Sequence, residues 1–293
     1  MRLFITGGSG LLGSRIAEIA INIGYDVYCG YNQHRPEFGK AVRIDLADTK
    51  TLSVLKEIRP DVIIHSAAIT DVDKCEVERD LAMKVNAEGV KALSEIAKEI
   101  GSFLIYISTD YVFDGEKGMY SEEDETNPVN FYGYTKLLGE KFCTDFCIAR
   151  TCVIYGARKA SGKQNFVLWL IEKLRNGESV KVVTDQFVTP TLNTNLARMI
   201  LEIAEERLKG IFHLAGATRI SRFDFALEIA REFGLDKGLI IPAKMHEMRW
   251  IARRPRDSSL STSKARRVLR EKPYELSRAL KVLKGELYEG DSC

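Results

Sequence analysis

A tyrosine and a lysine four residues apart are the first residues of this sequence that could do chemistry together. Tyr132 and Lys136 open a helical pattern, so their side chains share one helix face. A free phenol, with a pKa of about 10, is a poor acid at neutral pH, but a neighbouring ammonium lowers that pKa. The spacing predicts Tyr132 as a general acid tuned by Lys136. It also fits a tyrosine stem packed beside a solvated lysine.

A hydroxyl group at the end of a predicted strand adds a third member to this set. Residues 102–107 form an apolar run between a glycine and a polar turn, which predicts a buried strand. Ser108-Thr109-Asp110 follows directly. A hydroxyl, a phenol and an ammonium can together bind a substrate oxygen and transfer a proton to it. We therefore predict Thr109, Tyr132 and Lys136 as the catalytic residues.

Glycines near the start of the chain have the spacing of a dinucleotide-binding turn. Residues 2–6 predict a strand, and Gly7, Gly10 and Gly13 then give G-x-x-G-x-x-G at the entry to a helix. Glycine lets the backbone turn tightly and approach a pyrophosphate, while the helix N-terminus offers free N–H groups to the anion. The alternative is a glycine turn with a purely structural role.

The residues after the second predicted strand favour NADP(H) over NAD(H). In dinucleotide-binding folds an acidic residue at this point holds the ribose 2′-hydroxyl of NAD. Here the strand at 26–31 is followed by Asn32, Gln33, His34 and Arg35, with no carboxylate. We expect Arg35 to bind a 2′-phosphate with help from Asn32. Arg35 as a solvated loop residue before Pro36 is the alternative.

Alternation of apolar strands and helical patterns predicts the fold. Strands at 42–44 and 61–65 alternate with helical patterns at 49–58 and 72–100, which indicates an α/β, Rossmann-like, doubly wound parallel sheet. Ligands of such sheets bind beyond the carboxyl ends of the strands. The cofactor contacts expected there, besides Asn32 and Arg35, are Gly7, Gly10, Leu11, Leu12, Gly13, Asp45, Leu46, Ala67, Ala68, Tyr132 and Lys136.

The second half of the chain predicts a smaller substrate lobe interleaved with the sheet. Strands are expected at 180–183 and 211–214, and helices at 165–174, 193–206 and 222–233. We assign 1–155, completed by segments near 180–214, to the NADP-binding domain. Residues 156–179 and 215–293 form the smaller C-terminal substrate-binding lobe. No linker-like tract separates the two, so we expect one cooperative unit with a cleft.

Composition narrows the classes of function. The 293 residues carry a net charge of +2, which argues against a nucleic-acid or membrane-surface binder. Apolar runs fall short of the roughly 18 residues of a membrane span, and the first residues lack a signal-peptide layout. Six cysteines show no metal-ligand spacing with the four histidines. We expect a cytoplasmic protein with free thiols and no metal site.

Several of these segments resemble the dTDP-4-dehydrorhamnose reductase family of the extended short-chain dehydrogenase/reductase superfamily. The segments A-x-x-T-x-V-D-K-x-E, at 67–76, and S-T-D-Y-V-F-D-G, at 108–115, are specific to that branch. The likeness covers nearly the whole chain and is strongest over its first half. It includes residues 7–13, 61–68, 70–76, 85–86, 108–115, 132–140, 185–191, 210–216, 254–255 and 260–264.

The resemblance implies an activity and assigns roles to residues. The family uses NADPH to reduce the 4-keto group of a dTDP-linked 6-deoxyhexose, dTDP-4-dehydro-L-rhamnose, to dTDP-L-rhamnose. Tyr132 would protonate the new hydroxyl, Lys136 would also contact the nicotinamide ribose, and Thr109 would bind the carbonyl oxygen. The substrate contacts expected are Asp110, Val153, Asn165 and Arg254, with Arg254 against the diphosphate. A simple helix cap is the alternative for Asn165.

Two departures from the family pattern concern the sugar pocket. Close relatives often carry S-W-V-Y where this chain has Cys152-Val153-Ile154-Tyr155. Val188 stands where relatives usually have glycine. Neither change touches the predicted acid–base unit, but both bear on which sugar is bound.

Three other functions are compatible with the same motifs. A 4,6-dehydratase would carry a glutamate where this chain has Tyr111, and a 4-epimerase usually has an acidic residue after the second strand. A non-catalytic NADP-binding regulatory subunit, similar to the methionine adenosyltransferase β-subunit, would have no need of the catalytic set. The sequence leaves open the nucleotide, the 4-keto sugar, any use of Mg²⁺, and whether the chain is a monomer or a homodimer.

Overall fold

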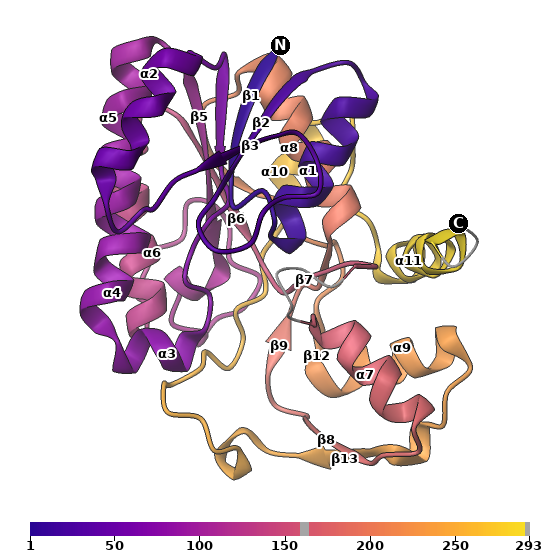
Figure 1. Cartoon of the computed structure of the whole chain (residues 1–293). Coiled ribbons are helices and arrows are strands. Elements are labelled where there is room, and N and C mark those ends of the chain that lie inside the picture. The colour runs from indigo at the N-terminus through magenta and orange to yellow at the C-terminus, as the bar shows by residue number, and fades with distance from the viewer. Residues whose placement is uncertain (159–163, 291–293) are drawn as a thin grey trace.

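A parallel sheet forms the centre of the molecule. The computed structural model describes residues 1–158 and 164–290. Within this part of the chain, seven strands pair in the order β11-β6-β5-β4-β1-β2-β3 (Figure 1). The predicted Rossmann-like, doubly wound sheet is confirmed. The strands are β1 (Arg2–Thr6), β2 (Asp26–Tyr31), β3 (Lys40–Arg43), β4 (Val62–His65), β5 (Phe103–Thr109), β6 (Cys147–Thr151) and β11 (Gly210–His213).

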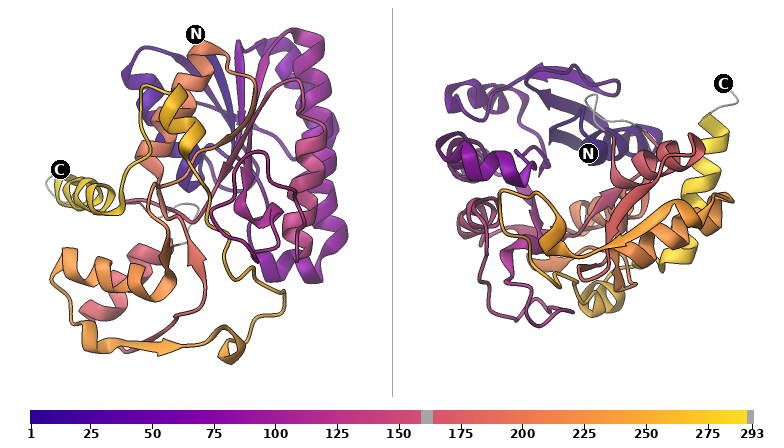
Figure 2. Two further views of the ribbon diagram at one scale, coloured as in Figure 1. Left: turned by 180° about the vertical axis from the view of Figure 1, so that it is seen from behind. Right: turned by 90° about the horizontal axis from the view of Figure 1, so that it is seen from below.

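Helices cover both faces of this sheet, which explains why β4 and β5 are apolar runs buried along their whole length. One face carries a layer of helices on the left of Figure 1, namely α2 (Val54–Ile58), α5 (Gly89–Ile100) and α6 (Phe131–Lys141). The other face carries α1 (Leu11–Asn22), α8 (Asn193–Glu206) and α10 (Ser263–Val268). The view from behind in Figure 2 shows the same two layers.

The segment 72–100, predicted as one helical pattern, is divided into several shorter helices. It consists of α3 (Val72–Val77), α4 (Arg79–Met83), a π-helical turn at Lys84–Glu88, and α5. Glu78 interrupts the first two helices with φ −102° and ψ 57°. In the π-helical turn, the Asn86 side chain exchanges hydrogen bonds of 2.9 and 3.0 Å with the backbone N–H and C=O of Ile69. The irregularity therefore fixes the loop that follows β4 at the sheet's carboxyl edge.

A smaller lobe lies beyond that edge, at the bottom of Figure 1, and has its own apolar core. Its helices are α7 (Phe166–Arg175), α9 (Arg222–Phe233) and α11 (Leu276–Gly290). Short strand pairs join them, and the view from behind in Figure 2 also shows the lobe below the sheet. The pairs are β8 (Val180–Val183) with β13 (Ile240–Ala243), β7 (Ile154–Tyr155) with β10 (Thr191–Leu192), and β9 (Phe187–Val188) with β12 (Ile220–Ser221).

Two segments belong to a different part of the molecule from the one we predicted. Strand β8 pairs in parallel with β13 inside the smaller lobe, so it does not complete the central sheet. In the other direction, Ala265 and Leu269 pack into the core of the larger domain. The apolar strand pattern of β8 could not distinguish these partners, because it specifies burial and not which edge is joined.

The described cysteines are all free thiols. Cys29, Cys75, Cys143, Cys147 and Cys152 are buried, whereas Cys293 lies outside the described residues. Burial raises the pKa of Cys29 and Cys143 to about 12, so these thiols stay protonated. Among the helices of the described residues, none is long and apolar enough to cross a membrane.

Candidate functional site

A cavity of about 850 Å³ lies at the carboxyl edge of the sheet and brings nearly all the predicted site residues together. It extends from the glycine turn to Asn165, which precedes α7 in the smaller lobe. Two of the predicted residues, Arg35 and Arg254, are not among its lining. The predicted residues that line it are Gly7, Gly10, Leu11, Leu12, Gly13, Asn32, Asp45, Leu46, Ala67, Ala68, Thr109, Asp110, Tyr132, Lys136, Val153 and Asn165.

The glycine turn between β1 and α1 leaves no room for side chains. Gly7 has φ +66°, and a Cβ there would lie 3.0 Å from the Ala67 backbone. A Cβ on Gly13 would lie 2.2 Å from the Gly7 carbonyl oxygen. No side chain caps α1 at Gly10, so its first N–H groups remain available to an anion. A dinucleotide pyrophosphate fits such a cradle.

The last residue of β2 and the residues after it line the cavity where the adenosine end of a dinucleotide would lie. Tyr31, Asn32, Gln33 and His34 line it, and Arg35 is exposed on the loop immediately beyond. None of these side chains is a carboxylate. The environment here is therefore compatible with an additional phosphate.

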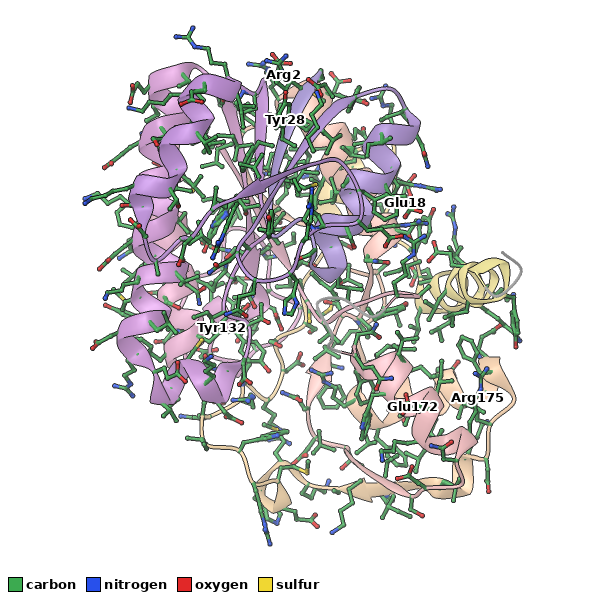
Figure 3. The ribbon with its side chains drawn as sticks, in the orientation of Figure 1. Arg2, Glu18, Tyr28, Tyr132, Glu172 and Arg175 are labelled. Atoms are coloured by element: carbon green, nitrogen blue, oxygen red, sulfur yellow. The ribbon has the colours of Figure 1, made fainter. Side chains whose placement is uncertain are left out.

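Thr109 and Tyr132 meet beside the cavity. Thr109 ends β5, and its hydroxyl accepts a hydrogen bond of 3.2 Å from the Tyr111 N–H. Tyr132 is the second residue of α6, which is capped by Asn130 through a 2.9 Å bond from the Gly133 N–H. Figure 3 shows Tyr132 at the end of α6 that faces the smaller lobe. A hydrogen bond with Thr109 acts to lower the pKa of the Tyr132 phenol.

Lys136 lies one helical turn after Tyr132 on α6 and is buried. Its Nζ donates a 2.8 Å hydrogen bond to the Ile107 carbonyl oxygen. The same ammonium lies 4.2 Å from the centroid of the Tyr106 ring. Burial lowers the pKa of Lys136 to about 7, while the charge of Glu140 acts in the opposite direction. Its ammonium therefore titrates close to neutral pH.

The expectation that Lys136 lowers the pKa of Tyr132 stays a prediction, because burial has the largest effect on this phenol. Burial raises the pKa of the Tyr132 phenol above its usual value, and the nearby carboxyl of Asp110 acts in the same direction. The Lys136 ammonium binds the Ile107 carbonyl and lies over the Tyr106 ring. The phenol therefore keeps its proton at neutral pH, and it can give that proton only to an oxygen more basic than itself, such as an alkoxide.

A buried ion pair at Glu140, one helical turn after Lys136, supports α6. Glu140 receives a bidentate pair of hydrogen bonds from Arg150 on β6, at 2.9 and 2.7 Å. The Ser108 hydroxyl donates to the same carboxylate. All three residues are less than 6 % exposed. This network joins α6 to β5 and β6, and it thereby fixes the helix that carries Tyr132 and Lys136.

Asp110 was predicted to contact substrate, but its carboxyl is already bound by neighbouring side chains. The Ser258 hydroxyl and the Cys152 thiol both donate to its Oδ2 atom, the thiol at 3.1 Å. Burial raises the pKa of this carboxyl. Asp110 lines the cavity, and its contacts here tie β5 to β6 and to the C-terminal segment.

Val153 lines the cavity with a strained backbone. Its φ of +42° lies in the left-handed region, which is unfavourable for a β-branched residue. Thr191 holds this turn on both sides, with its N–H bonded to the Val153 carbonyl and its hydroxyl bonded to the Cys152 carbonyl, at 3.1 and 2.6 Å. The strain is therefore maintained at the wall of the cavity where the family pattern has tryptophan.

Asn165 caps helix α7. Its side-chain oxygen accepts from the N–H groups of Val167 and Leu168, and its amide donates to the Gly156 carbonyl. The cap interpretation fits these bonds, and the residue also lines the cavity.

Arg254 was predicted to face a diphosphate, but its guanidinium pairs with Asp73 at 3.0 Å and lies over the Trp250 ring. The Asp73 carboxylate also accepts from the N–H groups of Ile251 and Ala252. Asn130 donates to the Arg253 carbonyl at 2.9 Å. These bonds strap the segment 250–254 onto α3 and the start of α6. The aspartate of the V-D-K-x-E pattern is thus an anchor for a distant segment.

Arg222, the first residue of α9, was missed by the sequence analysis. Its guanidinium lies 5.6 Å from the Phe166 ring centroid, next to the cavity-lining Asn165. Its positive charge acts against burial on the pKa of Asp110 and Tyr111, so it faces the larger domain. Its buried Nε finds no hydrogen-bond partner among the described residues. The sequence could not predict this position, because a single arginine at the start of a helix belongs to no recognisable motif.

No group of three or more acidic, histidine or cysteine side chains in residues 1–158 and 164–290 is arranged to hold a metal ion.

Comparison with known families and proteins gives consistent results over nearly the full length. The RmlD substrate binding domain family matches residues 1–288. A probable low-salt glycan biosynthesis reductase, Agl14, of Haloferax volcanii is 35% identical over 90% of both chains. Methionine adenosyltransferase 2 subunit beta of Danio rerio is 34% identical over 90% of this chain and 83% of its own. The dTDP-4-dehydrorhamnose reductase of Aggregatibacter actinomycetemcomitans is 33% identical over 96% and 97%.

Solved structures agree with these sequence relatives. A hypothetical dTDP-4-dehydrorhamnose reductase from Sulfolobus tokodaii is 42% identical, with a TM-score of 0.85 over 94% of this chain and 97% of its own. A dTDP-4-dehydrorhamnose reductase from Bacillus anthracis, in complex with NADP, is 32% identical, with a TM-score of 0.88 over 97% and 99%.

Proposed function

This chain belongs to the RmlD substrate binding domain family, and on that premise we propose that it reduces the 4-keto group of a nucleotide-linked 6-deoxyhexose with NADPH. The named substrate of the related reductases, dTDP-4-dehydro-L-rhamnose, is the first candidate. The observation that carries the proposal is one cavity lined by the glycine turn together with Thr109, Tyr132 and Lys136.

The cofactor would lie along the carboxyl edge of the sheet. The side-chain-free turn at Gly7 and Gly13 and the uncapped start of α1 fit its pyrophosphate. The complex of the Bacillus anthracis relative with NADP supports the same choice. When bound, NADPH supplies a hydride to the carbonyl carbon of the sugar. Lys136 would contact the nicotinamide ribose, at the floor of the cavity.

The residues of this chain would handle the oxygen of the same carbonyl. The Thr109 hydroxyl, which donates to Asp110 Oδ1 at 3.1 Å in this structure, would turn its hydrogen bond to that oxygen and stabilise the negative charge that develops as the carbon is reduced. Tyr132, which keeps its proton in this environment, would then transfer that proton to the oxygen and yield the alcohol. Solvent would reprotonate the phenolate. The buried pair of Glu140 and Arg150 holds α6, so the phenol stays fixed against Thr109 during the transfer.

Turnover of a panel of nucleotide-linked 4-keto sugars is the direct test. NADPH oxidation would be followed by absorbance, with dTDP-4-dehydro-L-rhamnose and its analogues on other nucleotides as substrates. We expect oxidation that depends on a 4-keto sugar and a product carrying a 4-hydroxyl group. The absence of turnover with every sugar would reject the proposal.

A regulatory role is the second candidate, favoured by the 34% identity to a methionine adenosyltransferase 2 subunit beta. In that case the chain would bind NADP(H) and change the activity of a partner enzyme without consuming NADPH. Tight NADP binding together with no turnover in the same panel would favour this alternative over the reductase.

NADPH should be the better reductant. We expect kcat/KM with NADPH to exceed that with NADH by roughly 10–100-fold, because a charge-assisted contact with the 2′-phosphate is worth about 1.5–3 kcal/mol. Arg35→Ala should remove much of that ratio. Arg175→Ala, at the exposed end of α7 (Figure 3), is the matched control and should keep it. A higher kcat/KM with NADH would contradict the assignment.

Arg222 should bind the diphosphate of the nucleotide-linked substrate, since its guanidinium lies beside Phe166, the neighbour of the cavity-lining Asn165, and its buried Nε has no hydrogen-bond partner among the described residues. We expect Arg222→Leu to raise the KM for the sugar nucleotide by roughly 10–100-fold and to leave the KM for NADPH nearly unchanged. Arg231→Leu, on the exposed part of the same helix, is the control. Equal KM values for the two variants would exclude this role.

A further inference from the structure

Tyr106 is a buried aromatic residue that none of the assignments above explains. It lies on β5, three residues before Thr109, and its side chain is 0% exposed. The Lys136 ammonium lies 4.2 Å from its ring centroid, well inside the distance at which a cation interacts with an aromatic face. The ring therefore contacts the lysine of the proposed reductase site directly.

We propose that Tyr106 is a positioning residue whose ring face holds the Lys136 ammonium in its charged form at the floor of the cavity. This inference rests on the proposed function in one respect, namely that Lys136 takes part in turnover. The contact between ring and ammonium stands on geometry alone.

Two neighbours fix the ring in this position. The Tyr106 hydroxyl donates a 3.2 Å hydrogen bond to the Lys136 backbone carbonyl, which ties the ring to α6. His65 on β4 stacks on Tyr106 with ring centroids 5.7 Å apart and planes 18° from parallel. His65 in turn is bonded through Nδ1 to the Thr6 hydroxyl at 2.7 Å. A column of side chains thus runs from the glycine turn to Lys136.

The ammonium needs this support because it is buried. Its single hydrogen bond to a described residue goes to the Ile107 carbonyl at 2.8 Å. A buried ammonium with few acceptors loses its proton readily, and a π-face is a further source of negative potential. Tyr106 provides that face without adding a carboxylate beside the cofactor site.

Apart from Glu140, the titratable groups around Lys136 are neutral, so they do not stabilise its ammonium. Glu140 on the same helix carries a negative charge, but that carboxylate is already bound by Arg150 and Ser108. The thiols of Cys75 and Cys143 stay protonated, because burial raises their pKa to about 11 and 12. Burial lowers the pKa of His65 to about 3, so its imidazole is neutral. The phenol of Tyr132 is also neutral.

The direction of the effect follows from which form the ring stabilises. A π-face favours the ammonium over the amine, so it raises the pKa of Lys136 against the effect of burial. Without the ring, Lys136 would lose its proton at a lower pH. Activity that needs the ammonium would then fall earlier as the pH rises.

Two substitutions separate the ring from the hydroxyl. Tyr106→Phe keeps the ring, and the basic limb of its kcat against pH should stay at the wild-type position. Tyr106→Leu removes the ring, and that limb should move to lower pH by about one unit, with an approximately tenfold loss of kcat above neutral pH. A Tyr106→Leu variant that loses kcat equally at every pH, or not at all, would overturn the proposal.

A measurement on the wild-type protein keeps the test independent of how Tyr106→Leu folds and of turnover. With ¹³C-labelled lysine, the Cε methylene resonance of Lys136 is identified by its loss in Lys136→Met. We expect ring-current shielding of this resonance and titration near neutral pH; an unshielded resonance would overturn the contact. Shielding in a protein that reduces no 4-keto sugar would reject the reductase proposal and leave the ring–ammonium contact standing.

Discussion

Replacing Tyr132 with phenylalanine is expected to lower kcat by about 10²–10⁴-fold, the usual contribution of a positioned general acid. The variant loses a single hydroxyl group, the one beside Thr109. The edge-to-face contact of its ring with Tyr111, with centroids 5.9 Å apart, does not need that hydroxyl, so the cavity wall should be unchanged. NADPH affinity, measured by fluorescence titration, should therefore stay close to the wild-type value.

Tyr134→Phe is the matched control for this experiment. Tyr134 lies on the same helix two residues later, but it is 45% exposed and outside the cavity. The same loss of a phenol hydroxyl should leave kcat within about twofold there, because surface changes of this kind are small. Turnover retained by Tyr132→Phe at the wild-type rate would remove Tyr132 from the mechanism.

Replacing Arg150 with methionine should cause the largest loss of stability. Arg150 and Glu140 are about 3 and 5% exposed along their side chains and are joined by two hydrogen bonds. Removing one partner of a buried pair leaves an uncompensated charge in the core, which costs about 3–5 kcal/mol. Urea unfolding should show this decrease in the free energy of unfolding.

Two controls distinguish the buried charge from the loss of side-chain packing. The double variant Arg150→Met/Glu140→Gln removes both charges and should recover part of the loss. Arg270→Met removes an arginine that is 71% exposed and paired with Glu202, and it should cost no more than about 1 kcal/mol. Equal losses in the Arg150 and Arg270 variants would contradict the assigned role of the buried pair.

Much of the framework was predictable because it depends on local pattern. The glycine spacing after β1, the apolar strands β4 and β5, and the four-residue spacing of Tyr132 and Lys136 each report a geometry set by a few neighbouring residues. The strands of a parallel sheet end at one edge, which explains why residues as distant as Leu11 and Ala67 line one cavity.

The sequence did not predict which side chains contact one another across the fold. Arg254 pairs with Asp73, and the Lys136 ammonium binds the Ile107 carbonyl and lies over the Tyr106 ring. Each choice depends on which segments the fold brings together and on the degree of burial, and residue spacing contains neither. Motif reasoning therefore identified the residues at the site more readily than the electrostatic consequence of their packing.

Strand order carries a consequence for biosynthesis. The outermost strand beside β6 is β11, so the two hydrogen-bonded neighbours Cys147–Thr151 and Gly210–His213 leave the ribosome far apart in time. Until β11 arrives, β6 is an open edge with unpaired backbone groups. Such an intermediate is a template for wrong pairing between nascent chains. The interval of translation between these two strands is thus the period in which this protein most needs protection from aggregation.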